Sequence, residues 1–160
     1  MESDDGGLQL TCSGCGNSWA PKPETVAGIG RSGLAVELGV YEDLLACLPA
    51  GAPWTEHGVI EHRFRLRRPE VYQHLLRTYG HHAEGTNKGW STSMFLAGAM
   101  GQLQREGLLV TRRAKPTGYW SYLGAVSYRA RPPEPDWEER LTWAAFAGEL
   151  GIDAEGWELA

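Results

Sequence analysis

Two amphipathic helical patterns that follow one another closely constrain the fold of this chain more than any other feature. Pro69 stands where a first-turn proline belongs, and apolar residues then recur at helical spacing as far as Gly80. A second pattern begins after Ser91 or Thr92, either of which can cap a helix, and ends at Gly107. The sequence therefore predicts two consecutive helices joined by a short polar connection.

A strand-forming stretch comes directly after the second helix. Residues 108–113 are apolar and then basic, residues 115–118 contain Pro and Gly, and residues 119–129 are rich in aromatic and β-favouring types. These two runs predict a β-hairpin. We interpret its aromatic side chains as packing against the helices. The alternative is an exposed ring, such as that of Trp120, that stacks against an altered or distorted base.

The upstream part of the chain shows two further patterns. Apolar residues recur at helical spacing over 37–48 and stop at Pro49, which predicts a helix there. Residues 55–66 are ambiguous, because part of the segment has helical spacing whereas the alternation over 63–67 suits a strand. We favour the helix.

The charge of the chain differs strongly between segments. Although the formal net charge is −5, residues 57–131 hold 12 Lys and Arg side chains against four Glu, which gives +8. Residues 1–56 carry −6 and residues 132–160 carry −7. A charge run is often only a solvated face, but an excess of this size predicts a polyanion partner for the middle of the chain.

The order of helix, connection, helix, Gly and basic hairpin is that of a helix-turn-helix with a wing. Residues 103–110 consist of an apolar helix ending, a charged pair, a Gly and an apolar strand, and the segment 93–110 resembles the recognition helix and first wing strand of winged-helix regulators. The resemblance covers residues 57–131. It implies that the helix 91–106 enters the major groove of DNA while the wing, residues 108–129, lies along the phosphates.

We therefore expect a mostly α, α+β fold with a winged helix-turn-helix domain at 37–131. An acidic tail with a cysteine knuckle at 1–36 precedes it, and a Pro-rich boundary opens an acidic segment at 132–160. Within that last segment, residues 137–150 predict an amphipathic helix rich in Trp. Since exposed Trp is costly in water, we expect this helix to contact a second copy of the chain or a protein partner.

The resemblance also implies which residues contact DNA. Cations of the wing would bind phosphates, while polar residues of the helix would read base edges. Small residues dominate the outward face of the helix, and Gly98 and Gly101 each cost about 1 kcal/mol relative to Ala, so we expect a close neighbour there. The expected DNA contacts are Lys88, Ser91, Thr92, Ser93, Gln102, Arg105, Arg112, Arg113, Lys115 and Tyr119.

The three cysteines indicate metal chemistry more than a disulfide framework. Cys12 and Cys15 form a Cys-x-x-Cys pair that resembles the first knuckle of a zinc ribbon. A structural zinc would need further ligands, for which Cys47 and one of His57, His62, His81 or His82 are the candidates. The alternatives are a degenerate knuckle, or a dimer that shares one metal. Reduced cysteines and the absence of a long apolar run predict a cytoplasmic protein that does not enter a membrane.

Sequence patterns of enzymes do not accompany these features. The sequence has no nucleophile motif, phosphate loop or His-Glu-x-x-His pattern, and the basic segment 57–131 contains no Asp with which to build a nuclease metal site. We expect a double-stranded DNA-binding protein that regulates transcription and is not an enzyme. The alternatives are a winged-helix module that docks onto proteins, or an accessory subunit of a complex that processes nucleic acids.

Overall fold

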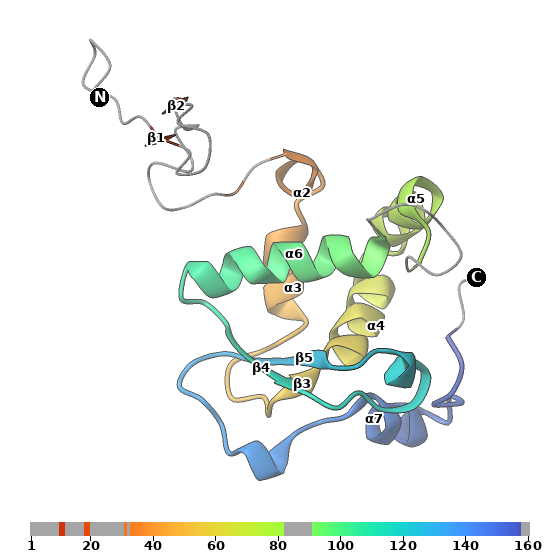
Figure 1. The fold of residues 1–160 in the computed structure, drawn as a ribbon. Coiled ribbons are helices and arrows are strands. Elements are labelled where there is room, and N and C mark those ends of the chain that lie inside the picture. Colours follow the sequence, from red (N-terminus) through yellow and green to blue (C-terminus); the bar gives the residue numbers. More distant parts are fainter. Residues whose placement is uncertain (1–9, 12–17, 20–30, 32, 82–90, 158–160) are drawn as a thin grey trace.

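The computed structural model describes residues 10–11, 18–19, 31, 33–81 and 91–157. The fold is α+β, with helices around a small three-stranded antiparallel sheet (Figure 1). The helices are α2 (Gly33–Glu37), α3 (Val40–Ala46), α4 (His57–Arg67), α5 (Pro69–Tyr79), α6 (Thr92–Arg105) and α7 (Trp143–Leu150). The strands are β1 (Leu10–Thr11), β2 (Ser18–Trp19), β3 (Thr55–Glu56), β4 (Val110–Ala114) and β5 (Val126–Ala130). Two 3₁₀ helices complete the order, η1 (Gly118–Tyr122) and η2 (Trp137–Glu139).

Local signals in the sequence set the ends of α5 and α6, as predicted. Pro69 opens α5, and Ser91 caps α6 by accepting a hydrogen bond from the Met94 amide at 3.2 Å. At the other end of α6, Gly107 adopts a left-handed conformation with φ 79°. The Leu108 amide can therefore bond the Leu103 carbonyl at 3.0 Å, which closes the helix in a Schellman turn.

The two upstream predictions are right in type and differ in detail. The apolar pattern over 37–48 forms α3, but Gly39 (φ 66°) separates it from the short α2. The ambiguous segment 55–66 begins with the two-residue strand β3 and continues as α4, so residues 63–67, whose alternation suited a strand, are helical. In α4 the helical interpretation is confirmed.

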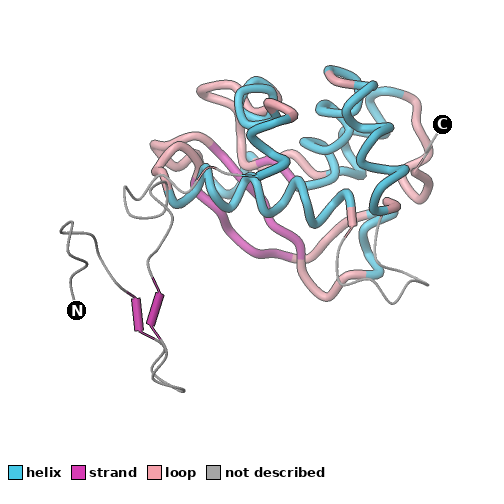
Figure 2. The backbone as a smooth tube through the Cα atoms, turned by 90° about the horizontal axis from the view of Figure 1, so that it is seen from above, coloured by secondary structure: helices cyan, strands magenta, loops and turns pink. Residues whose placement is uncertain are grey.

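The three-stranded sheet has the order β3-β5-β4. The helix α6 runs above this sheet in Figure 1 and crosses over it when the molecule is seen from above in Figure 2. Because Arg113 pairs with Ser127 and Thr55 with Arg129, these side chains lie on one face of the sheet. Arg112 and its partner Tyr128 lie on the opposite face.

The hairpin made by β4 and β5 differs from the prediction in its second half. Residues 119–122 were expected in a strand, but they belong to the 3₁₀ helix η1, and β5 begins only at Val126. Tertiary contacts override the strand propensity of these aromatic residues. The Tyr119 amide bonds the Ala154 carbonyl at 2.7 Å, and the Trp120 ring packs against Gly58 of α4. Trp120 is only 1% exposed, so the alternative of an exposed stacking ring at this position is wrong.

The segment after residue 131 packs into the same core as the rest of the chain. Leu141 bonds the backbone of Trp54 at 2.6 Å and of Glu56 at 2.9 Å, which extends the sheet by a bridge. The predicted helix over 137–150 is split into η2 and α7. Trp143 of α7 is 1% exposed, and Trp137 packs edge-on against Tyr128. Trp143 is therefore buried by its own chain, and Trp137 is partly buried by it.

Candidate functional site

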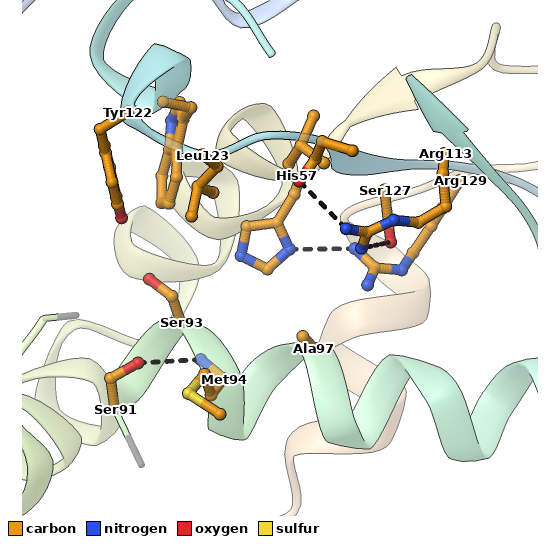
Figure 3. A pocket seen from close by; sticks show the side chains of 13 residues that line it. His57, Ser91, Ser93, Met94, Ala97, Arg113, Tyr122, Leu123, Ser127 and Arg129 are labelled. Atoms are coloured by element: carbon orange, nitrogen blue, oxygen red, sulfur yellow. Dashed lines mark hydrogen bonds between the residues drawn. The ribbon is translucent and has the colours of Figure 1, made fainter. Parts of the chain in front are cut away.

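A pocket of about 630 Å³ lies between the N-terminal half of α6 and the β4–β5 hairpin, residues 110–130. Figure 3 shows that the His57 ring lies between the two walls. The lining side chains come from elements far apart in sequence. They are His57, Ser91, Ser93, Met94, Ala97, Arg113, Trp120, Tyr122, Leu123, Ala125, Val126, Ser127 and Arg129.

Two arginines form a cationic wall of this pocket. Arg129 is 4% exposed, and its Nη1 donates to Nδ1 of His57 at 2.9 Å. Burial, and after it the charge of Arg113, lowers the pKa of Arg129 to about 10. Arg113 is exposed and donates to the Ser127 hydroxyl at 3.4 Å and to the Ala125 carbonyl at 3.1 Å. Within the described part of the chain, neither guanidinium lies within 4.0 Å of a carboxylate.

The opposite side of the pocket is largely apolar. Met94 and Ala97 of α6 face it from below in Figure 3, while Leu123 and Val126 line it from the hairpin and Trp120 from η1. Met94 is 41% exposed. The pocket thus combines a cationic wall with an apolar body, which is the usual composition of a small-molecule site.

A fully buried carboxylate, that of Glu61 in α4, lies behind His57. It accepts hydrogen bonds from His57 Nε2 at 3.2 Å, from His81 Nε2 at 2.7 Å and from the Tyr72 hydroxyl at 2.9 Å. Burial alone would raise the pKa of Glu61, but the hydrogen bonds from the two histidines outweigh it and hold that pKa well below its usual range. The ionised carboxylate is therefore the stable form.

The proton positions on His57 follow from its partners. A guanidinium can only donate, so Nδ1 of His57 must accept from Arg129, and its proton lies on Nε2, which donates to Glu61. Burial lowers the pKa of His57 and keeps the ring neutral. A continuous chain of hydrogen bonds therefore leads from the Arg129 cation through a neutral imidazole to the Glu61 anion.

This network does not have the geometry of a nucleophilic relay. The Ser93 hydroxyl lies 3.5 Å from Nε2 of His81, the same nitrogen that bonds Glu61. A serine triad needs the hydroxyl and the carboxylate at different ring nitrogens. The arrangement instead serves to bury a charge and to hold the pocket wall in place.

Four residues expected on the outward face of α6 are buried, so that part of the prediction is wrong. They are Ser91, Thr92, Ser93 and Gln102. The C-terminal end of α5 contacts the start of α6, since the Thr92 amide bonds the Gly80 carbonyl at 2.9 Å. Farther along, Gln102 is held by Arg105 and Glu106. The sequence pattern could not show that α6 is covered on more than one side.

The outward face of α6 is a stripe of mostly small residues. Met94, Gly98 and Arg105 are exposed, and Ala97 and Gly101 are partly exposed between them. A Cβ added at Gly101 would meet only the Arg105 side chain, at 3.7 Å. The close neighbour expected at Gly101 is therefore not found within the described residues.

The cations expected on the hairpin point in different directions. Arg112 lies over the Trp137 ring at 4.2 Å, on the face opposite Arg113. Lys115 is exposed just after β4. Tyr119 is half-buried and its hydroxyl lies 3.2 Å from Nδ1 of His81. Lys88 falls outside the described residues.

Several other basic residues of the segment 57–131 are held by their own chain. Arg67 and Arg68 both pair with Asp43, and Arg131 donates to the carbonyls of Leu45 and Leu48. The excess of positive charge is thus divided among several faces of the molecule, and only part of it borders the pocket and the α6 stripe.

The predicted zinc site falls mostly outside the described residues, which include neither Cys12 nor Cys15. Cys47 is buried, and burial raises the pKa of its thiol to about 11, which disfavours the thiolate that binds zinc. In the ranges that the structure describes, no cluster of three or more His, Cys, Asp or Glu side chains could hold a metal.

Comparisons of the chain with protein-family models, with curated proteins and with solved structures give no match. Among the described helices, none is long and apolar enough to cross a membrane.

The sequence patterns did not predict the pocket or the Glu61 network. One signal was present, because His57 and Glu61 are spaced i, i+4 on a helix whose neighbours are apolar.

Proposed function

We propose that this chain is a winged-helix protein that binds double-stranded DNA and regulates transcription. The observation that carries the proposal is the succession α5, α6, β4 and β5, a helix pair followed by an antiparallel hairpin, with β3 added at the edge of β5. In this interpretation α6 is the recognition helix and the β4–β5 hairpin is the wing.

The α6 stripe would lie against the duplex. Small side chains at Ala97, Gly98 and Gly101 allow the helix backbone to approach DNA closely, and Arg105 supplies a long polar group at the end of the stripe. Lys115 on the hairpin would bind phosphate. Because few side chains on the stripe can read base edges, affinity would come mainly from phosphate contacts and sequence preference would be weak.

Binding of a fluorescent duplex to the full chain, followed by anisotropy, tests this surface. The Arg105→Ala/Lys115→Ala double variant should bind at least ten times more weakly than wild type. Arg67→Ala is the matched control, since Arg67 pairs with Asp43 on α3 and should leave affinity unchanged. An equal loss of duplex affinity in both variants would show that binding depends on overall charge and not on the α6 surface.

A protein-docking module is the second candidate function. It is favoured by three exposed apolar side chains that line the pocket, Met94, Tyr122 and Leu123, which a protein partner would cover. Absence of duplex binding at low salt would favour this alternative.

A further inference from the structure

We propose that the pocket between α6 and the β4–β5 hairpin binds a small organic anion, a carboxylate attached to a planar apolar group. The proposal concerns a ligand of the isolated protein and does not rest on DNA binding.

The positive charge of the pocket wall faces no carboxylate among the described residues. Arg129 is 4% exposed, yet the only hydrogen bond of its side chain within the described residues goes to the neutral His57 ring. A buried cation without a facing anion is costly. Glu61, which is reached only through His57, is already occupied by its own donors. An anion in the pocket would face the guanidinium directly.

Arg113 adds a second cation to the same wall. Strand alternation puts Arg113, Ser127 and Arg129 on the same face of the sheet, and all of them line the pocket. Two guanidinium groups on one wall repel each other. A carboxylate removes this repulsion and matches the planar geometry of a guanidinium.

The remaining walls select the body of the ligand. Trp120, Met94, Ala97 and Leu123 offer apolar surface, and the volume of about 630 Å³ lies within the range of small-molecule sites. The first amides of α6 are not available to a phosphate group, because the Ser93 amide bonds the His81 carbonyl at 3.1 Å and the Met94 amide bonds Ser91. The arginines and apolar walls therefore favour a carboxylate on an aromatic body over a phosphate ester.

Titration of the ¹⁵N-labelled full chain with 2-naphthoate, followed by NMR, tests the proposal. The uncharged 2-naphthamide has nearly the same shape and is the ligand control. We expect saturable shifts that include the Trp120 indole N–H, with naphthoate binding at least ten times more tightly than the amide. Arg129→Met should remove this preference for the acid, and Arg113→Gln should lower the affinity for naphthoate at least threefold.

Arg112→Gln is the matched protein control, because Arg112 lies on the same strand as Arg113 but on its other face, over Trp137. It should leave naphthoate affinity unchanged. If circular dichroism shows that Arg129→Met does not fold, the naphthoate affinities of Arg113→Gln and Arg112→Gln still test whether the cationic wall binds the carboxylate. Equal affinity for the acid and the amide, no binding of naphthoate, or equal effects of Arg113→Gln and Arg112→Gln would each overturn the proposal. None of these outcomes depends on whether the chain binds DNA.

Discussion

The hydrogen bond from Tyr72 to Glu61 is one of three that this buried carboxylate accepts. Tyr72→Phe removes one donor from a charged acceptor and should lower the free energy of unfolding by about 1.5–3 kcal/mol. Tyr79→Phe on the same helix is the control, since Tyr79 is partly exposed and stacks on Phe95 with its ring. Urea denaturation of both variants measures the difference, and equal effects would contradict the role given to Glu61.

The same cluster makes stability depend on pH. The pKa of His57 is lowered from its ordinary 6.5 by burial, and that of Glu61 is lowered from 4.5 because hydrogen bonds from His57 and His81 outweigh burial. In both cases the unfolded chain binds the proton more readily than the folded chain, so stability falls as pH falls. The loss from His57 should begin below about pH 6.5 and that from Glu61 below about pH 4.5.

Urea denaturation at pH 7.5 and pH 5.5 isolates the histidine contribution. His57→Gln should reduce the loss of stability between these two pH values. His74→Gln, at an exposed position of α5, should keep the wild-type loss. An unchanged pH dependence in His57→Gln would show that His57 is not buried in its neutral form.

The contact between α4 and η1 depends on a glycine. A Cβ at Gly58 would overlap the Trp120 indole, so Gly58→Ala should force one element away from the other and cost about 1–3 kcal/mol. Gly148→Ala in α7 is the matched control, because nothing lies within 4 Å of the added atom and Ala favours a helix by up to about 1 kcal/mol. Thermal melts followed by circular dichroism compare the two, and a neutral Gly58→Ala would contradict this packing.

Elements with local signals at their ends could be predicted from the sequence. The helices α5 and α6 were found because Pro69, Ser91 and Gly107 act on their own neighbours. The 3₁₀ helix η1 was missed because contacts with α4 and Ala154 determine it, and these partners are distant in sequence. The pocket was missed for the same reason, since its walls come from several elements.

The C-terminal segment, residues 132–157, packs against the rest of the described chain and belongs to the same folding unit. Truncation after Arg131 would remove Leu141 from the edge of the sheet and Trp143 from the core. Loss of a buried Trp alone costs about 3–5 kcal/mol, against a total stability of about 5–15 kcal/mol for a typical domain. We expect the truncated chain to show no cooperative melting transition. The control is the untruncated Glu134→Gln/Glu138→Gln variant, which is altered at exposed positions of the same segment and should melt like wild type. A truncated chain that melts cooperatively would show that residues 132–160 are not needed for the fold.

The salt dependence of duplex binding shows whether this chain binds DNA through phosphate contacts. A labelled random-sequence duplex is titrated with the full chain between about 50 and 200 mM salt, a range over which phosphate contacts are progressively screened. With Arg105, Arg113 and Lys115 near the duplex, we expect log K to fall with log salt at a slope of about −3. No binding at the lowest salt, or binding that salt does not weaken, would contradict the account of this chain as a winged-helix DNA-binding protein.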